Sequence, residues 1–305
     1  MEKLLITGIA GGQGRLLARR LAERFEVCGV DRVRWEGHPR GVRPYVVDLR
    51  KKKFEDVIRK EKPSCVVHLG FIQGFRTDER ERHDVNVAGT KQLLDHCLHY
   101  GVESLVVLSS GYVYGAFPEN PYYMDEDAPL SASRSYPEIR DHVEVDTLVT
   151  AFLWRYPQIK TCVLRPVNVL GYYAHSMISH YLRERRVPTV MGFDPMMQFI
   201  HEEDLSMAIE RTIDHRLQGV FNVTGPGEVP LRTAIREAGG ESWSIPESIL
   251  RPLFRRLFGW GLSGYPPGAL DFLKYPITIS GKRFADATGF QPLFGLKETL
   301  QSVRG

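Results

Sequence analysis

Leu4-Leu5-Ile6-Thr7-Gly8-Ile9-Ala10-Gly11-Gly12-Gln13-Gly14 is an apolar run that leads directly into three glycines at every third position, before a segment with helical periodicity. Gly8 permits a tight turn out of a strand, Gly11 lets the backbone approach a ligand without a Cβ, and Gly14 allows a helix to pack closely on the strand. The start of that helix offers unpaired N–H groups to an anion. The pattern therefore predicts a strand, a loop and a helix that hold a pyrophosphate.

A second strand is expected to end at an acidic residue. Residues 25–31 are mostly apolar and finish at Asp31, which lies 17 residues after Gly14. This is where a dinucleotide-binding unit places the carboxylate that accepts hydrogen bonds from the adenosine ribose. The alternative is an ordinary glycine turn with an incidental surface aspartate. Because strand, loop, helix and second strand follow in order, we favour a nucleotide cradle over that alternative.

The composition is that of an ordinary globular protein. The chain has 305 residues, 43% hydrophobic and 25% charged, and its 40 basic against 37 acidic residues give no electrostatic case for binding nucleic acid. The four cysteines lie far apart, which favours reduced core thiols over disulfides or a metal site. A first strand at about Lys3 leaves no room for a signal peptide, and no apolar run reaches the roughly 20 residues of a membrane span, so we expect a cytoplasmic protein without an integral membrane segment.

Strand-like and helix-like runs alternate through the first half of the chain, which predicts an α/β fold with a Rossmann-type doubly wound parallel sheet. We expect a dinucleotide-binding domain over residues 1–171, and over 172–305 a smaller, irregular lobe that mainly binds substrate. Two segments of this lobe are expected to return to the main sheet, Phe221–Val223 and the helical run 204–215. The expected parallel strands are Leu4–Thr7, Glu26–Asp31, Pro44–Asp48, Cys65–Gly70, Ser104–Ser110 and Lys160–Arg165. Ligands of such sheets bind beyond the carboxyl ends of the strands.

A serine and a tyrosine with suitable chemistry follow this pattern. Ser110 ends an expected strand, Tyr136 comes 26 residues later and Arg140 four positions further on. In a helix, positions four apart share a face, so Tyr136 and Arg140 are expected to address one ligand. A serine that polarises a carbonyl oxygen, a tyrosine that exchanges its proton and a nearby cation are suited to hydride transfer beside a nicotinamide.

The chain resembles the extended short-chain dehydrogenase/reductase family, of the NAD-dependent epimerase/dehydratase type. Motifs similar to those of the family span nearly the whole chain in the right order, and the sequence shows them at Thr7-Gly8 to Gly14, Asp31, Asp48-Leu49, Val67–Gly70, Asn86–Thr90, Ser109-Ser110, Val113-Tyr114-Gly115, Tyr136, Leu164–Gly171, Phe199–Asp204 and Phe221–Val223. The resemblance implies an NAD(P)-dependent oxidoreductase or epimerase that acts at a secondary alcohol or ketone.

The resemblance also implies roles for single residues. Ser110 would polarise the substrate oxygen, Tyr136 would be the general acid/base, and Arg140 would be the neighbouring cation. Tyr112 and Asn168 would contact a small-molecule substrate. The helices beginning near Arg82 and Tyr136 could pair in a homodimer. Cofactor-binding residues would be Gly8, Gly11, Gly12, Gln13, Gly14, Asp31, Arg32, Asp48, Leu49, Leu69, Gly70, Asn86, Ser109, Tyr136, Arg140, Pro166 and Val167.

Several residues leave alternatives open. Arg140 stands where the family has lysine, and arginine keeps the charge but cannot relay a proton, so the alternatives are an atypical enzyme and a catalytically impaired NAD(P)-binding regulator or sensor. Asp31 would repel a 2′-phosphate, which favours NAD, whereas Arg32 and Arg34 keep NADP open. His68 and His201 are more simply explained as caps or turn residues than as ligands.

The second lobe carries information about the substrate. It lacks the Arg-x-Gly-Asp-like element that contacts the diphosphate in nucleotide-sugar members of the family. Residues 261–275 form instead an aromatic and aliphatic rim, which favours a more apolar substrate, unless these residues only build the core of the lobe. A nucleotide-sugar 4-epimerase or dehydratase is the alternative enzyme. The amphipathic run 249–260 with Arg251, Arg255 and Arg256 leaves binding to an anionic membrane surface as the weakest alternative.

Overall fold

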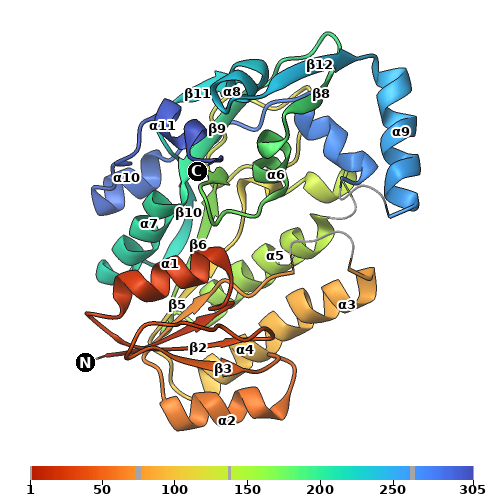
Figure 1. Ribbon diagram of the computed structural model, residues 1–305. Coiled ribbons are helices and arrows are strands. Elements are labelled where there is room, and N and C mark those ends of the chain that lie inside the picture. The colour runs from red at the N-terminus through yellow and green to blue at the C-terminus, as the bar shows by residue number, and fades with distance from the viewer. Residues whose placement is uncertain (1, 73–76, 137–138, 262–264, 305) are drawn as a thin grey trace.

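Within the described residues, the main sheet has seven strands, all parallel to their neighbours, in the order β10-β6-β5-β4-β1-β2-β3 (Figure 1). The computed structural model describes residues 2–72, 77–136, 139–261 and 265–304. The chain builds the sheet outward from β1 in both directions, which is the doubly wound arrangement. The strands are β1 (Lys3–Thr7), β2 (Glu26–Asp31), β3 (Arg43–Val46), β4 (Cys65–His68), β5 (Ser104–Leu108), β6 (Lys160–Pro166) and β10 (Gly219–Val223).

Helices cover both faces of this sheet because successive strand side chains point to opposite sides. Leu4 and Ile6 join the core cluster under α1, α7 and α10, whereas Leu5 joins the cluster under α2, α4 and α5. Both faces of β1 are therefore buried. The covering helices are α1 (Gly12–Leu21), α2 (Lys52–Glu61), α4 (Gly89–His99), α5 (Arg140–Arg155), α7 (Glu202–Asp214) and α10 (Lys282–Thr288), and α3 (Glu79–His83) precedes the π-helical turn η1 (Asp84–Ala88).

The C-terminal part adds two small sheets above the main one (Figure 1). One has the order β11-β9-β7 and the other pairs β12 with β8, and a third core cluster lies between them and the neighbouring helices. The strands are β7 (Asn168–Leu170), β8 (Arg186–Val190), β9 (Met196–His201), β11 (Glu228–Pro230) and β12 (Glu241–Ile245). The helices are α6 (Met177–Arg183), α8 (Leu231–Glu237), α9 (Glu247–Gly259), α11 (Leu296–Gln301) and the 3₁₀ segments η2 (Gly111–Tyr114), η3 (Ala132–Arg134) and η5 (Pro267–Leu273).

The predicted α/β fold with its parallel Rossmann-type sheet is confirmed, with shifts at the strand ends. The third, fourth and fifth strands stop two residues before their expected ends, so Asp48, Gly70 and Ser110 lie in the loops at the carboxyl edge. The segment Phe221–Val223 does return to the sheet, where β10 pairs with β6. The division of the chain into domains at residue 171 stays a prediction. All four cysteines are buried and free of disulfides.

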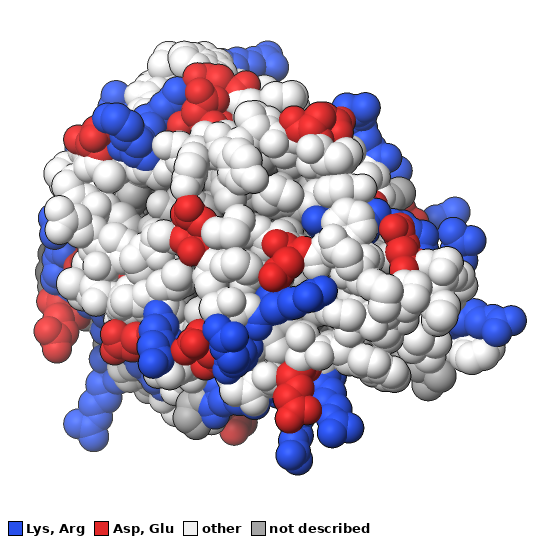
Figure 2. Space-filling view, turned by 90° about the horizontal axis from the view of Figure 1, so that it is seen from above, with Lys and Arg blue, Asp and Glu red and all other residues white. Residues whose placement is uncertain are grey.

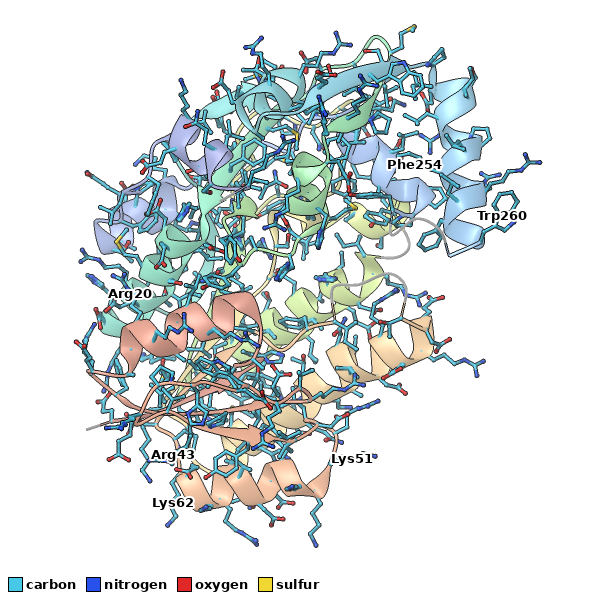
Figure 3. All side chains as sticks on the ribbon, in the orientation of Figure 1. Arg20, Arg43, Lys51, Lys62, Phe254 and Trp260 are labelled. Atoms are coloured by element: carbon cyan, nitrogen blue, oxygen red, sulfur yellow. The ribbon has the colours of Figure 1, made fainter. Side chains whose placement is uncertain are left out.

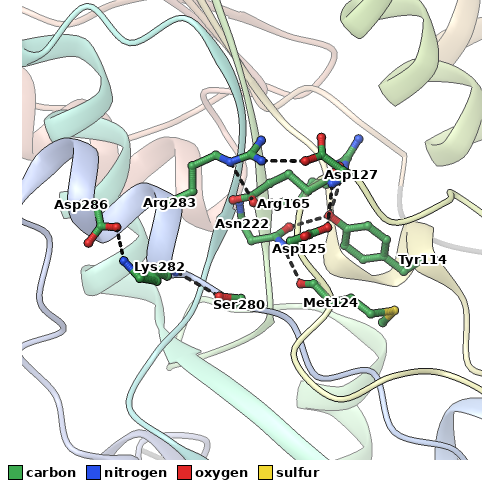
Figure 4. A network of polar contacts seen from close by, with 11 residues as sticks. Tyr114, Met124, Asp125, Asp127, Arg165, Asn222, Ser280, Lys282, Arg283 and Asp286 are labelled. Atoms are coloured by element: carbon green, nitrogen blue, oxygen red, sulfur yellow. Dashed lines mark hydrogen bonds and ion pairs between the residues drawn. The ribbon is translucent and has the colours of Figure 1, made fainter.

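A buried polar network connects the far edge of the main sheet to the loops before it (Figure 4). Arg165 of β6 donates to the Tyr114 hydroxyl at 2.9 Å and to the Glu126 carbonyl at 3.0 Å. The Tyr114 hydroxyl in turn donates to Oδ1 of Asn222 on β10 at 2.7 Å. Arg165 comes near the carboxyl end of its strand, but its burial and these contacts make it part of the framework of the fold.

Surface charge is mixed in sign. On the upper face, Lys and Arg groups alternate with Asp and Glu groups around the rim and do not gather into a basic surface (Figure 2). Ion pairs also join separate elements, as where Arg20 of α1 contacts Glu210 of α7 and Arg24 contacts Glu210 and Asp214. Figure 3 shows Arg20 between these two helices. Mixed charge of this kind gives no electrostatic footprint for nucleic acid on this face.

Candidate functional site

The glycine loop after β1 needs its glycines for steric reasons. Gly8 has φ = +72°, and a Cβ there would lie 2.9 Å from the backbone of Gly70. A Cβ on Gly14 would lie 2.2 Å from the carbonyl oxygen of Gly8, and one on Gly11 would lie 3.3 Å from the same oxygen. Gly8 therefore makes the tight turn and Gly14 allows the close packing of helix on strand, which are two of the roles expected for these glycines.

The first turn of α1 is free of side-chain caps. Gly11 is the N-cap residue, without a side-chain hydrogen bond, and the turn contains no acidic residue. Its partial positive charge is thus available to an anion. Two predicted cofactor residues of this turn make contacts of another kind: a Cβ on Gly12 would lie 2.1 Å from the Tyr173 carbonyl oxygen, and Gln13 Nε2 donates to Ser206 Oγ at 2.7 Å and to the Glu202 carbonyl.

A cleft of about 320 Å³ lies beside this loop, and we call it the glycine-loop cleft. Eight of the predicted cofactor residues line it, namely Gly8, Gly11, Asp31, Arg32, Asp48, Leu49, Leu69 and Gly70. Asp31 holds the loop in shape, since Oδ2 accepts from the Ala10 N–H at 2.9 Å and Oδ1 accepts from the Val33 N–H at 3.0 Å. The carboxyl ends of β1, β2 and β4 thus bring together residues that are up to 62 positions apart, from Gly8 to Gly70.

Two charged residues of the cleft, Arg32 and Asp48, have partners of opposite charge. Arg50 donates to both carboxylate oxygens of Asp48 and, because of these hydrogen bonds, the pKa of Asp48 is lowered. Arg32 pairs with Glu81 at 2.7 Å and lies 3.9 Å from Asp48. Two carboxylates therefore oppose the positive charge of Arg32 at this end of the cleft.

A second cavity, of about 130 Å³, adjoins the first, and Leu69 and Phe71 line both. We call it the serine–tyrosine cavity. Its described lining contains no Asp, Glu, Lys or Arg. It consists of Leu69, Phe71, Leu108, Ser109, Ser110, Tyr112, Tyr136, Ile139, His142, Pro166, Val167, Asn168, Val169, Ser176 and Met177. A ligand in this cavity meets mostly apolar atoms and a few hydroxyl, amide and imidazole groups.

Several of these polar groups are bound to each other. The Tyr112 hydroxyl donates to Oδ1 of Asn168, whose Nδ2 donates to the Gln198 carbonyl at 2.8 Å. Ser109 Oγ donates to Asp146 at 2.5 Å. Ser110 Oγ accepts from the Tyr112 N–H at 3.2 Å, which leaves its own hydroxyl proton for a ligand. Of the two predicted serines, Ser110 is therefore the better placed to donate to a substrate oxygen.

Tyr136 lines the same cavity as Ser110, as the sequence predicts, but Arg140 does not. The expectation that Tyr136 and Arg140 share one helical face is wrong, because α5 begins at Arg140 and Tyr136 lies before it. Tyr136 is buried against Phe272 of η5, at a ring distance of 5.3 Å. The Arg140 side chain is 56% exposed and donates to Glu79 of α3 at 2.9 Å. Residues 137 and 138, between them, lie outside the described part of the chain.

Three other predicted or considered residues hold the framework. Asn86 binds the backbone of Ile72 through both ends of its amide and lines neither cavity. His68 bridges Thr7 at 2.6 Å and Thr90 at 2.9 Å, and burial lowers its pKa to about 3. His201 caps α7 and stacks on Phe294. His201 is therefore the cap residue that we expected, whereas His68 is a buried strand residue that joins two threonines and is neither a cap nor a turn residue.

The sequence analysis missed several lining residues. Most are apolar side chains that no motif distinguishes from core residues, among them Phe71, Ile72 and Val85. His142 is different, since it is a titratable residue of α5 that comes two positions after Arg140 and lines the serine–tyrosine cavity. Its closeness to Tyr136 in the sequence was the one available signal. In the described residues no cluster of three or more His, Cys, Asp or Glu could hold a metal ion.

No described residue of the predicted rim 261–275 lines the serine–tyrosine cavity. Leu270, Phe272 and Leu273 are buried in core clusters of the C-terminal part, as the alternative explanation of this segment expects. Phe272 of η5 packs on both Tyr136 and Tyr112, and Met177 separates the cavity from a small apolar pocket formed with Phe254, Tyr265 and Leu273. Residues 262–264 of the predicted rim lie outside the described part. Figure 3 shows Phe254 on the inner side of α9 and Trp260 at its outer end.

The basic residues of α9 are divided in their contacts. Arg251 binds Glu247 and Asp271, both at 2.7 Å, while Arg255 and Arg256 are exposed. Of the three arginines that suggested a membrane surface, Arg255 and Arg256 are therefore exposed to solvent, near the exposed side chains of Ile249, Leu253 and Trp260. None of the helices in the described ranges has the length and apolar character needed to traverse a bilayer.

Comparisons with known proteins agree with this geometry. The model of the family described as "NAD dependent epimerase/dehydratase family" matches residues 4–224. An uncharacterized protein of Mycobacterium tuberculosis, Rv0501, is 30% identical over 256 residues, covering 80% of this chain and 67% of the relative. The 3 beta-hydroxysteroid dehydrogenase type 7 of Homo sapiens is 26% identical over 201 residues, covering 59% of this chain and 53% of that protein.

Among solved structures, the UDP-glucose 4-epimerase of Thermus thermophilus in complex with NAD superposes with a TM-score of 0.78 at 24% identity, covering 99% of each chain. MoeE5 in complex with UDP-glucuronic acid and NAD gives the same TM-score at 23% identity, with 98% of this chain and 97% of that one covered. At these identities the two structures show the fold alone. The family model covers well over half of the sequence, and the chain therefore belongs to the NAD-dependent epimerase/dehydratase family.

Proposed function

We propose that this protein is an NAD-dependent oxidoreductase that transfers a hydride at a secondary alcohol or ketone carbon of an apolar small molecule. The observation that carries the proposal is the lining of the serine–tyrosine cavity, where Ser110 and Tyr136 stand among apolar side chains and the described residues supply no charge. A substrate diphosphate placed there would lose its water without gaining a cationic partner, which is costly.

The residues of the glycine-loop cleft fit a dinucleotide. The loop approaches a ligand through glycine, the uncapped first turn of α1 favours a pyrophosphate, and the Asp31 carboxylate is suited to ribose hydroxyls. Asp48 and Leu49 line the far end of the cleft, where an adenine would lie. NAD, when bound, would accept a hydride from the alcohol carbon or, as NADH, return one to the ketone. NAD rather than NADP is supported because Glu81 and Asp48 oppose the charge of Arg32.

The chain's own residues would manage the proton. Reduction of a ketone adds a hydride to carbon and a proton to oxygen, and we assign that proton to the Tyr136 hydroxyl. In the reverse direction the Tyr136 phenolate would take up the hydroxyl proton of the alcohol as the hydride leaves its carbon. Ser110 would hold the substrate oxygen through the hydroxyl proton that its contact with Tyr112 leaves unused. Tyr112 and Asn168, bound to each other, would form the wall on the substrate side. The apolar surroundings exclude water from the reacting carbon.

A panel of secondary alcohols of increasing apolar size, incubated with NAD and the purified protein, tests the proposal through the absorbance of NADH formed. We expect turnover with apolar alcohols and at least a hundredfold lower rate for Tyr136→Phe, which keeps the ring but loses the proton. The same assay on UDP-glucose and UDP-galactose addresses the nucleotide-sugar alternative. Turnover of the sugars alone would refute an apolar substrate.

A second candidate is a dinucleotide-binding protein with impaired turnover. It is favoured by Arg140, which pairs with Glu79 at the surface and so supplies no cation to Tyr136 in this structure. Tight NADH binding without hydride transfer on either panel would support it. Activity gained by Arg140→Lys, from an inert parent, would assign the impairment to this position.

A further inference from the structure

One residue that lines the serine–tyrosine cavity has a polar side-chain atom without a partner in the described part of the chain. Nδ1 of His142 is buried and lacks a hydrogen bond in the described residues. Four other side-chain atoms share this condition, but they belong to residues that line neither cavity. A buried imidazole nitrogen without a partner is unfavourable, so either water or a ligand is expected to satisfy it.

His142 lies beside the junction of the two cavities. Its ring centroid is 6.2 Å from that of Phe71, one of the two residues that line both the glycine-loop cleft and the serine–tyrosine cavity. A dinucleotide with its adenosine in the cleft and its reactive ring beside Tyr136 would have to cross this junction. The second ribose, which carries two adjacent hydroxyls, is attached to the reactive ring and would then lie near the junction.

The other polar side chains of the cavity offer little to that ribose. Tyr112 and Asn168 bind each other, Ser109 binds Asp146, and Ser176 Oγ contacts the Val169 carbonyl at 3.4 Å. Arg140, the cation predicted for this place, points to Glu79 outside the cavity. Ser110 and Tyr136 are assigned above to the substrate oxygen, so His142 is the remaining polar side chain of the described lining, and it has a buried nitrogen without a partner.

We propose that His142 hydrogen-bonds the ribose of the nicotinamide half of the cofactor, an inference that rests on the proposed function. A neutral imidazole has one donor and one acceptor nitrogen, which matches hydroxyls that both donate and accept. Burial, together with the nearby Arg82, lowers the pKa of His142 to about 4 against the opposing effect of Asp141, so the ring is neutral near pH 7.

Binding of three ligands can distinguish a contact between His142 and the second ribose from contacts elsewhere in the site. NADH and ADP-ribose contain the second ribose, whereas ADP contains only the adenosine and diphosphate. Dissociation constants measured by calorimetry for the three ligands, on the parent protein and on His142→Ala, locate the contact without requiring turnover. For the loss of one neutral hydrogen bond we expect NADH and ADP-ribose to bind about three- to tenfold more weakly, with ADP unchanged.

Two further variants provide controls. His142→Asn keeps a donor near the position of Nδ1 and should recover most of the affinity for ADP-ribose. His83→Ala removes a histidine whose contact with Glu144 is at the surface, and it should leave all three dissociation constants unchanged.

Equal affinities of His142→Ala and the parent for ADP-ribose would overturn the inference, as would a loss of the same size for ADP. A parent protein that binds none of the three ligands would instead contradict the proposed function itself.

Discussion

The ion pair between Asp146 of α5 and Arg165 of β6 offers the sharpest test of the framework behind the site. The Arg165 guanidinium donates to both carboxylate oxygens of Asp146, through Nε at 2.9 Å and Nη2 at 2.6 Å. The two side chains are 4% and 0% exposed. Burial lowers the pKa of Arg165, but the hydrogen bonds and charge of Asp146 outweigh it and raise the pKa above its ordinary value.

Asp146→Ala should therefore be strongly destabilising. Arginine stays charged at any accessible pH, so the variant buries a guanidinium whose described acceptors are the Tyr114 hydroxyl and the Glu126 carbonyl. Breaking a buried pair in this way costs about 3–5 kcal/mol, a large part of a typical free energy of unfolding of about 5–15 kcal/mol. Ser109 loses its acceptor as well, which loosens the loop that carries Ser110.

Urea denaturation measures the loss in free energy of unfolding, and a double-mutant cycle shows how much of it comes from the pair of Asp146 and Arg165. Asp146→Ala, Arg165→Ala and the double variant should give free energies that are far from additive, because the double variant leaves neither charge unpaired. Asp56→Ala is the control, since Asp56 and Arg59 are 49% and 65% exposed and their pair should contribute less than about 1 kcal/mol. A loss below about 1 kcal/mol for Asp146→Ala, or additive single effects, would refute the reasoning.

Three further predictions concern the loop, the cofactor and pH. Gly14→Ala should lower the free energy of unfolding by about 1–3 kcal/mol and weaken NADH binding, because the new Cβ would lie 2.2 Å from the Gly8 carbonyl oxygen. The control is Gly259→Ala, which has open space around it and should leave the free energy of unfolding unchanged or raise it. An unchanged free energy of unfolding for Gly14→Ala would show that the loop packs differently. NADH should bind about tenfold more tightly than NADPH, because the Asp31 carboxylate repels a 2′-phosphate. Asp31→Asn should reduce the ratio of the two dissociation constants measured by calorimetry. An unchanged ratio would show that Asp31 does not cause the preference. Burial holds the pKa of His68 at about 3, so its ring is neutral in the folded protein while the unfolded chain takes up a proton below about pH 6.5. His68 should therefore lower the free energy of unfolding by about 2 kcal/mol between pH 7 and pH 5. A His68→Gln variant whose free energy of unfolding changes with pH as steeply as that of the parent would contradict this.

Local patterns in the sequence were sufficient for the sheet and the glycine-loop cleft. A strand buried on both faces is a short apolar run, and the turn after β1 can be made only with glycine at Gly8, so both leave a signal within a few residues. Asp31, Asp48 and Leu69 could be placed for the same reason, because each comes at the end of a strand or just after it and all strand ends of a parallel sheet meet at one edge.

Tertiary packing decided the direction of the side chains around Tyr136. The spacing of Tyr136 and Arg140 is compatible with one helical face, yet α5 starts only at Arg140, and the arginine pairs with Glu79, which is 61 positions away in the sequence. His142 lines the cavity because α5 packs beside the loop that carries Phe71, and Phe272 of η5 packs against the lining residue Tyr136. Such contacts depend on how distant segments meet, and a pattern within one segment carries no information about its partner.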